Sequence, residues 1–87
     1  MARRRQLYLK ALNNPNGLRF VEFTRLPEGF GFTLDRQRGS HRLYVREDVR
    51  EFVNVQPPSN GKAKPAQVRE FLALVQRYTL QVDEDDV

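Results

Sequence analysis

The sequence lacks cysteine and tryptophan, and it has one histidine and one methionine. Without cysteine the chain forms no disulfide and offers no thiolate nucleophile, which fits a reducing cytoplasm. One histidine is too few ligands for a structural zinc site, so we expect no metal and no small-molecule cofactor. No apolar run is long enough to span a bilayer, and the basic residues 3–5 are not followed by the apolar segment of a signal peptide. We therefore expect a cytoplasmic protein that does not bind membranes.

Charge is distributed unevenly along the 87 residues, which suffice for one small domain with a modest core. The net charge is +4, but residues 83–86 alone contribute −4, so the remainder carries +8. Such a basic domain suits a polyanion, although a solvated charged surface would give the same composition. We predict a single domain over residues 1–82, followed by a disordered acidic tail over residues 83–87.

Two N-terminal stretches favour helices. Apolar residues over 3–12, followed by a break rich in Asn, Pro and Gly, predict an additional N-terminal helix within residues 1–14. Residues 19–28 are compatible with a helix or a strand, and the spacing of the phenylalanines favours a short helix. We expect that helix to end near Pro27, with Gly29 making the turn.

Three short segments alternate apolar and polar residues, as half-buried strands do: 30–36, 40–45 and 52–56. Short connections between them, one with Gly39, predict an antiparallel meander. A helix is expected over residues 65–78, because proline stands in its first turn and apolar residues recur at helical spacing. The fold class is therefore α+β: an α-β-β-β-α core, similar to double-stranded RNA-binding domains (dsRBD-like), with a three-stranded antiparallel sheet covered by helices on one face.

The predicted core takes one apolar face from each of these elements: Phe30, Phe32, Leu34, Leu43, Val45, Val68, Leu72 and Val75. Strict alternation also places His41 on the face of Leu43 and Val45, with Ser40, Arg42 and Tyr44 on the opposite face. If helices cover the first face, His41 must lie at its rim. Tyr44 would then belong to the open surface, where it could stack on a base.

The only histidine, His41, is the candidate catalytic residue. An imidazole ionises near neutral pH and so suits proton transfer, while arginines suit a phosphate. The residues expected to contact RNA surround it or precede the last helix: Arg36, Arg38, Ser40, Arg42, Lys62 and Lys64. Each has a plainer interpretation as well. A lone histidine is most often structural, Ser40 can be a turn residue, and the two lysines can serve solubility.

Taken together, three motifs resemble the HicA toxins of prokaryotic type II toxin–antitoxin systems: Gly29–Phe32, Arg38–His41, and Gly61–Pro65 followed by Gln67–Arg69. The resemblance implies a dsRBD-like endoribonuclease that cleaves mRNA, requires the motif histidine, and is neutralised by a HicB-like antitoxin. The histidine corresponds to His41. Many relatives carry a second histidine where this chain has Arg42, so the other proton transfer would need another group or water.

Two further interpretations stay open from the sequence. The chain could be a non-catalytic module that binds double-stranded RNA through its basic residues. It could also be an inactive HicA-like interaction protein, which would act mainly by binding its antitoxin partner. DNA binding by this chain alone is less expected, because no helix-turn-helix or basic recognition helix is evident.

Overall fold

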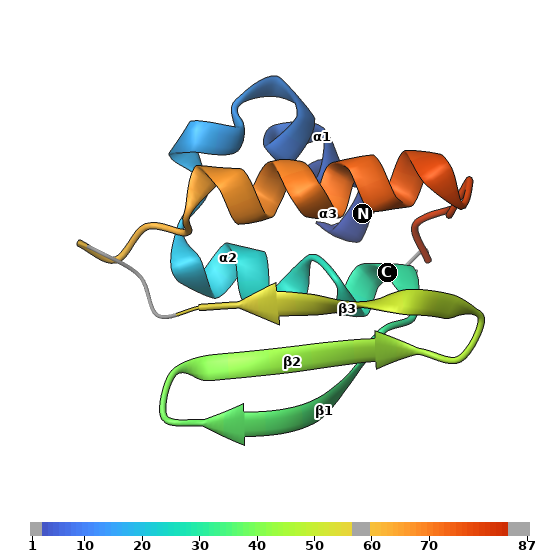
Figure 1. The fold of residues 1–87 in the computed structure, drawn as a ribbon. Coiled ribbons are helices and arrows are strands. Elements are labelled where there is room, and N and C mark those ends of the chain that lie inside the picture. Colours follow the sequence, from blue (N-terminus) through green and yellow to red (C-terminus); the bar gives the residue numbers. More distant parts are fainter. Residues whose placement is uncertain (1–2, 57–59, 84–87) are drawn as a thin grey trace.

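The fold is built on one antiparallel sheet whose three strands follow one another along the chain (Figure 1). The computed structural model describes residues 3–56 and 60–83. The strands are β1 (Thr33–Arg38), β2 (His41–Arg46) and β3 (Val49–Val55), with β2 in the centre. Both neighbouring pairs are antiparallel, which confirms the predicted meander.

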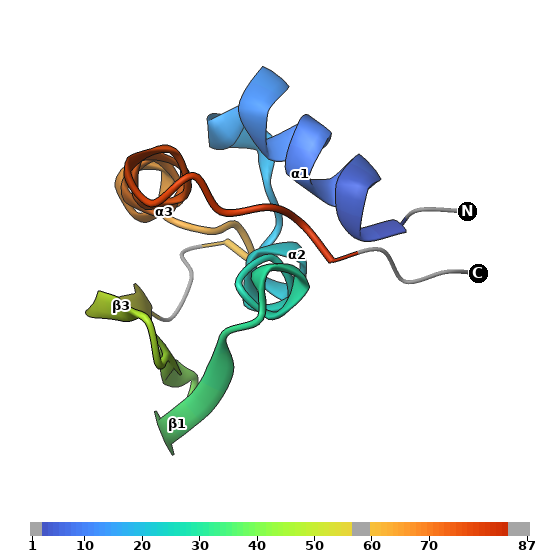
Figure 2. The same cartoon turned by 90° about the vertical axis from the view of Figure 1, so that its right-hand side faces the viewer.

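All the helices lie on one side of this sheet (Figure 2). The helices α2 (Phe20–Arg25) and α3 (Pro65–Arg77) are nearest to the strands, and α1 (Arg3–Asn13) is farthest from them. Helix α1 is nevertheless anchored, because Ala11 is fully buried and the ring of Tyr8 meets that of Phe30 edge-on at 5.0 Å. The predicted α+β class, with one covered sheet face and an additional N-terminal helix, is confirmed.

The connection from α2 to β1 differs from the prediction in its turn residue. Helix α2 ends at Arg25, so it does end close to Pro27 as predicted. Pro27 directly precedes a short 3₁₀ turn, η2 (Glu28–Phe30). The residue with a left-handed backbone is Gly31, at φ 84°, and not Gly29, which lies inside η2. A second 3₁₀ turn, η1 (Pro15–Gly17), joins α1 to α2.

The covered face of β2 is the one that carries Tyr44, so the predicted assignment of Leu43 and Val45 to the core is wrong. Tyr44 is fully buried and lies opposite Val53 of β3, whereas Leu43 and Val45 are only half-buried. In sequence the face with Leu43 and Val45 is the more apolar, because the other face carries Arg42 and Arg46. The register of β2 with the valines of β3 nevertheless places Tyr44 toward the helices. Bulges between Leu34 and Arg36, and between Tyr44 and Arg46, further disturb simple alternation.

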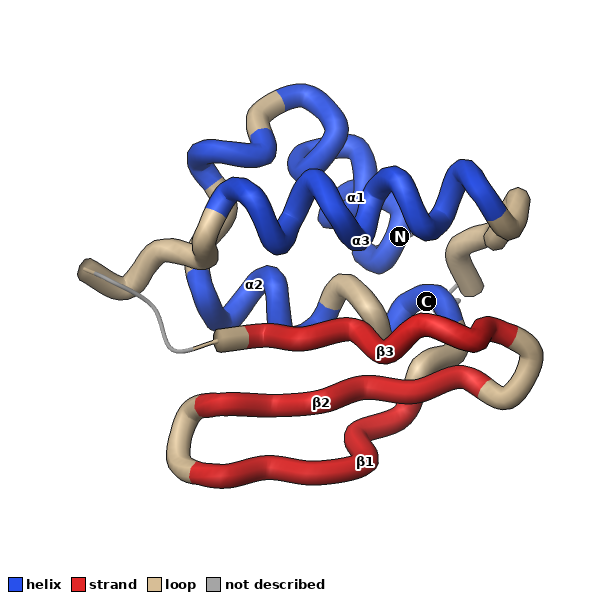
Figure 3. The backbone as a smooth tube through the Cα atoms, in the orientation of Figure 1, coloured by secondary structure: helices blue, strands red, loops and turns tan. Residues whose placement is uncertain are grey.

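Leu34 is the third predicted core residue that is not buried in the structure. It pairs with Tyr44 and so faces the helices, but it is 43% exposed. The reason is its strand, because β1 is the edge of the sheet farthest from the helices (Figure 3). The other predicted core residues are buried as expected: Phe30, Phe32, Val68, Leu72 and Val75.

The chain beyond α3 packs back onto the domain. Leu80 and Val82 are partly buried against the core, and the Asp83 amide donates to the carbonyl of Gly29 at 2.7 Å. Only Asp83 of the predicted acidic tail belongs to the described residues, so the disorder predicted for residues 84–87 lies outside them. In the described ranges, no helix is both long and apolar enough to cross a membrane.

Candidate active site

His41 is exposed at the start of β2, directly after the turn that joins it to β1. Gly39 in that turn has φ 60°, a conformation that costs a glycine little and other residues more. His41 shares its sheet face with Leu43 and Val45, as alternation predicts. Because this face is not the one covered by helices, the imidazole is accessible to a large substrate.

A hydrogen bond to Asn54 holds the imidazole of His41. The distance from Nε2 of His41 to Oδ1 of Asn54 is 2.6 Å, and the two residues come from adjacent strands. A carboxamide oxygen only accepts, so Nε2–H must donate in this pair. A neutral imidazole held in this way keeps its lone pair on Nδ1, where it can take a proton from a substrate.

Asn54 belongs to the candidate site but was not predicted from the sequence. It stands between the buried residues Val53 and Val55, and its cross-strand partner is Leu43. A polar residue between two buried ones indicates a strand with one open face. The sequence does not indicate that its side chain contacts the histidine. Only the register of β2 on β3 brings the two side chains together.

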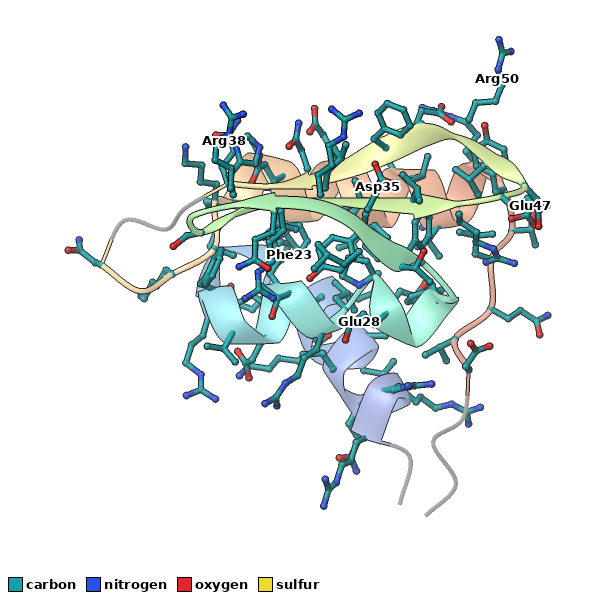
Figure 4. All side chains as sticks on the ribbon, turned by 90° about the horizontal axis from the view of Figure 1, so that it is seen from below. Phe23, Glu28, Asp35, Arg38, Glu47 and Arg50 are labelled. Carbon is teal, nitrogen blue, oxygen red and sulfur yellow. The ribbon has the colours of Figure 1, made fainter. Side chains whose placement is uncertain are left out.

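Two of the predicted arginines lie on the same face as the histidine. Arg38 pairs directly with His41 across the sheet, and Arg36 pairs with Leu43. The side chain of Arg38 lies on the side of the sheet away from Phe23 and Glu28 of the helical layer (Figure 4). Arg36 also forms an exposed ion pair with Asp35 at 3.7 Å. Both guanidinium groups are in position to meet a phosphate near the imidazole.

These side chains border an open depression of about 660 Å³ on the sheet surface. Its lining comes from the ends of all three strands at one edge of the molecule: Arg36, Gln37, Arg38, His41, Leu43 and Asn54. The depression thus combines a proton-transfer group, an amide that orients it and two permanent positive charges. Within the described ranges, no three His, Cys, Asp or Glu side chains lie close enough together to hold a metal ion.

Arg42 is not brought to this depression. It pairs with Gln37 and Val55 on the face toward the helices, and its Nε is buried without a hydrogen-bond partner among the described residues. The structure therefore separates Arg42 from Arg36 and Arg38. Ser40 lies exposed in the turn next to His41, where it remains a candidate phosphate contact.

The segment that carries the two predicted lysines precedes α3 and lies at the same end of the molecule as the β1–β2 turn and the end of β3 (Figure 1). Lys64 Nζ donates to Oε1 of Gln56 at 2.7 Å, directly after β3. Lys62 is exposed, and its backbone forms an isolated bridge with Arg19. Their proximity to the strand ends is compatible with a shared surface for RNA, which stays a prediction.

Tyr44 cannot stack on a nucleic-acid base, because it is fully buried beneath the sheet and its hydroxyl finds no partner among the described residues. That possibility from the sequence is therefore wrong. The exposed aromatic residue of the sheet is Phe52 on β3, which is 65% exposed.

The family described as HicA toxin of bacterial toxin–antitoxin matches residues 21–76, well over half of the chain. No curated protein and no solved structure matches the chain. The matched segment contains the whole sheet, with His41 and Asn54, and nearly all of α2 and α3, whereas α1 lies outside it. The chain therefore belongs to the HicA toxin family of bacterial toxin–antitoxin systems.

Proposed function

We propose that the protein is an mRNA-cleaving endoribonuclease, the toxin of a type II toxin–antitoxin system, and that His41 is its catalytic residue. The observation that carries the proposal is the pair of His41 and Asn54 at 2.6 Å, on an open sheet face beside Arg36 and Arg38. Family membership supports a toxin. His41 is exposed and is held by Asn54, which supports it as the group that transfers the proton.

RNA supplies its own nucleophile for this reaction. A base takes the proton of the 2′-hydroxyl, O2′ attacks the adjacent phosphorus, and the P–O5′ bond breaks as O5′ accepts a proton. The products are a 2′,3′-cyclic phosphate and a 5′-hydroxyl, and no oxidant or reductant is needed. In this proposal Nδ1 of neutral His41 acts as the base. Water or another group must protonate O5′, because the chain has no second histidine.

Arg36 and Arg38 would stabilise the reaction electrostatically. The phosphorus gains negative charge in the transition state, and fixed positive groups aimed at that charge are often the largest contribution to catalysis. A guanidinium is permanently protonated and so cannot serve as the acid. Ser40 would add a hydrogen bond to a phosphate oxygen. Lys62 and Lys64 would bind phosphates of the RNA backbone at a greater distance from the cleavage position.

The partner that we propose is a HicB-like antitoxin. Membership of a toxin family of toxin–antitoxin systems implies an antitoxin. The open sheet face, with its arginines and half-buried apolar residues, offers such a protein a surface whose occupation would exclude RNA.

The proposed chemistry is tested by incubating purified protein with a 5′-labelled RNA, with and without EDTA, and analysing the product ends. We expect fragments with 5′-hydroxyl and 2′,3′-cyclic phosphate ends, formed equally well in EDTA. A single 2′-deoxy substitution at a cleavage position should block cutting there. Fragments with 5′-phosphates, or a reaction that stops in EDTA, would contradict the mechanism. RNA that is bound but never cut would favour the non-catalytic module.

A further inference from the structure

We propose that Phe52 is a stacking platform for an unpaired base, and that the substrate of the His41 site is single-stranded RNA. This inference rests on the proposed function and extends it to a class of RNA. Phe52 is 65% exposed, more than any other large apolar residue in the described ranges. A ring so open contributes little to the core, so its place on the sheet is the feature to explain.

Phe52 lies on the same sheet face as the candidate active site. In β3, Val53 and Val55 are buried and Asn54 is exposed, so Phe52 and Asn54 point to the same open side. Residues two apart in a strand are separated by about 6.6 Å. A base stacked on Phe52 would therefore place a neighbouring phosphate of the same strand close to the His41–Asn54 pair.

The surroundings of Phe52 suit a nucleic-acid strand. Leu43 and Val45, half-buried on the adjacent strand, supply an apolar floor on the same face. Arginines flank that floor at both ends: Figure 4 shows Arg38 at one end and Arg50 at the other, on the side away from the helices. Asp35, which Figure 4 shows between these two arginines, forms an ion pair with Arg36. An apolar strip between positive charges is complementary to bases joined by phosphates.

The exposed ring also discriminates between the two forms of RNA. In a duplex the bases are stacked on one another and their faces are hidden, so double-stranded RNA is recognised by its shape, phosphates and 2′-hydroxyls. A flat aromatic side chain on a sheet can contact only bases that are unpaired and splayed out. The basic residues alone would serve either form, whereas Phe52 favours the single strand.

The test compares affinities for a fluorescein-labelled single-stranded RNA and for a hairpin duplex of the same composition. All proteins carry His41→Ala, so binding is measured without cleavage. Phe52→Ala should weaken single-strand binding about fivefold to a hundredfold, the range measured for loss of one stacked base. Phe52→Tyr should restore it, and Phe52→Leu should not. Duplex affinity should change less than twofold. The control Val21→Ala removes another exposed apolar side chain, 53% exposed on α2, and should alter neither affinity.

Unchanged single-strand affinity in Phe52→Ala would overturn the proposal, as would an equal weakening for both RNAs. A defect confined to antitoxin binding would also overturn it, and would make Phe52 a protein contact. Thermal unfolding of each variant separates these outcomes from misfolding, and Phe52→Leu keeps the apolar contact if the alanine variant is unstable. Because binding is measured without cleavage, the test of base stacking on Phe52 is independent of the test of nuclease activity. Either proposal can therefore be contradicted while the other is confirmed.

Discussion

His41 and Asn54 stand on neighbouring strands with Nε2 and Oδ1 2.6 Å apart, on the sheet face opposite the helices. Both residues are exposed, so their hydrogen bond adds little to the stability of the fold. Its consequence is chemical, because it orients the ring through Nε2 and leaves Nδ1 as the accepting nitrogen. We therefore propose Asn54 as a positioning residue for His41, the group that would meet the substrate.

Replacing Asn54 should lower the rate of RNA cleavage without abolishing it. Asn54→Ala frees the imidazole to rotate, and we expect a loss of about a hundredfold in single-turnover rate, since small misplacements cost that much. RNA affinity should be nearly unchanged. Asn54→Asp puts a negative charge beside the ring and favours the imidazolium, so the pH–rate profile should move to higher pH. If Asn54→Ala cuts as fast as the wild type, the residue has no positioning role.

Tyr44→Phe should leave the protein as stable as the wild type or more stable. The ring is fully buried, but the hydroxyl has no hydrogen-bond partner among the described residues. Removing a buried, unpaired hydroxyl should raise the free energy of unfolding by up to about 1 kcal/mol. Urea unfolding measures this, with Tyr78→Phe as the matched variant, because the Tyr78 hydroxyl does donate to Glu51 at 2.6 Å. Clear destabilisation by Tyr44→Phe would mean that its hydroxyl is bonded.

The contact between Tyr78 and Glu51 should give stability a pH dependence at both ends of the scale. The hydrogen bond from Tyr78, aided by Arg77, lowers the pKa of Glu51 below 4.5 although partial burial opposes this. The same bond raises the pKa of Tyr78 above 10.0. Because the pKa of Glu51 is lowered, the stability that it contributes above pH 4.5 is lost as the pH falls. Because the pKa of Tyr78 is raised, the stability that it contributes below pH 10.0 is lost as the pH rises.

Tyr78→Phe isolates that contact. In an NMR titration of side-chain carboxyls, the pKa of Glu51 should return toward 4.5, its ordinary value. Glu22, whose carboxylate bonds to Lys10 at 2.7 Å, should keep its own value and serves as the internal control. If Glu51 titrates unchanged in Tyr78→Phe, then Arg77 rather than the tyrosine determines its pKa.

RNA affinity should fall steeply with added salt, because each Arg or Lys that binds a phosphate releases counterions. The double variant Lys62→Glu, Lys64→Glu should bind more weakly and with a shallower dependence on salt concentration, if this segment touches the RNA backbone. The expected reduction in slope is about 0.7 for each phosphate of a single strand that the variant no longer neutralises. An unchanged slope would place both lysines outside the binding surface.

The sequence predicted the order of elements well, because that order depends on local signals. Pro65 in a first helical turn and Gly39 between two alternating segments each mark a boundary directly. The choice of buried face depends on something else. Tyr44 and Leu43 are both acceptable core residues, and only the pairing of β2 with β3 shows which one meets the helices.

The candidate site was predictable to a similar degree. His41 stands out because it is the only histidine, and its nearness to Arg38 follows from a tight turn between two strands. Arg42 is closer to His41 in the chain but lies on the other face. Asn54 and Phe52 are unremarkable in sequence, since their proposed roles depend on their positions in β3, which begins eight residues after the histidine.

The most direct test of the central claim is the single-turnover rate of RNA cleavage by purified His41→Ala beside the wild type. Removing a general base usually costs about a hundredfold to ten-thousandfold in rate. We expect a loss in that range, with the circular dichroism spectrum, RNA affinity and antitoxin binding of the wild type retained, and with growth inhibition in cells abolished. A His41→Ala protein that folds, binds RNA and still cleaves it at the wild-type rate would contradict the assignment of His41 as the catalytic residue.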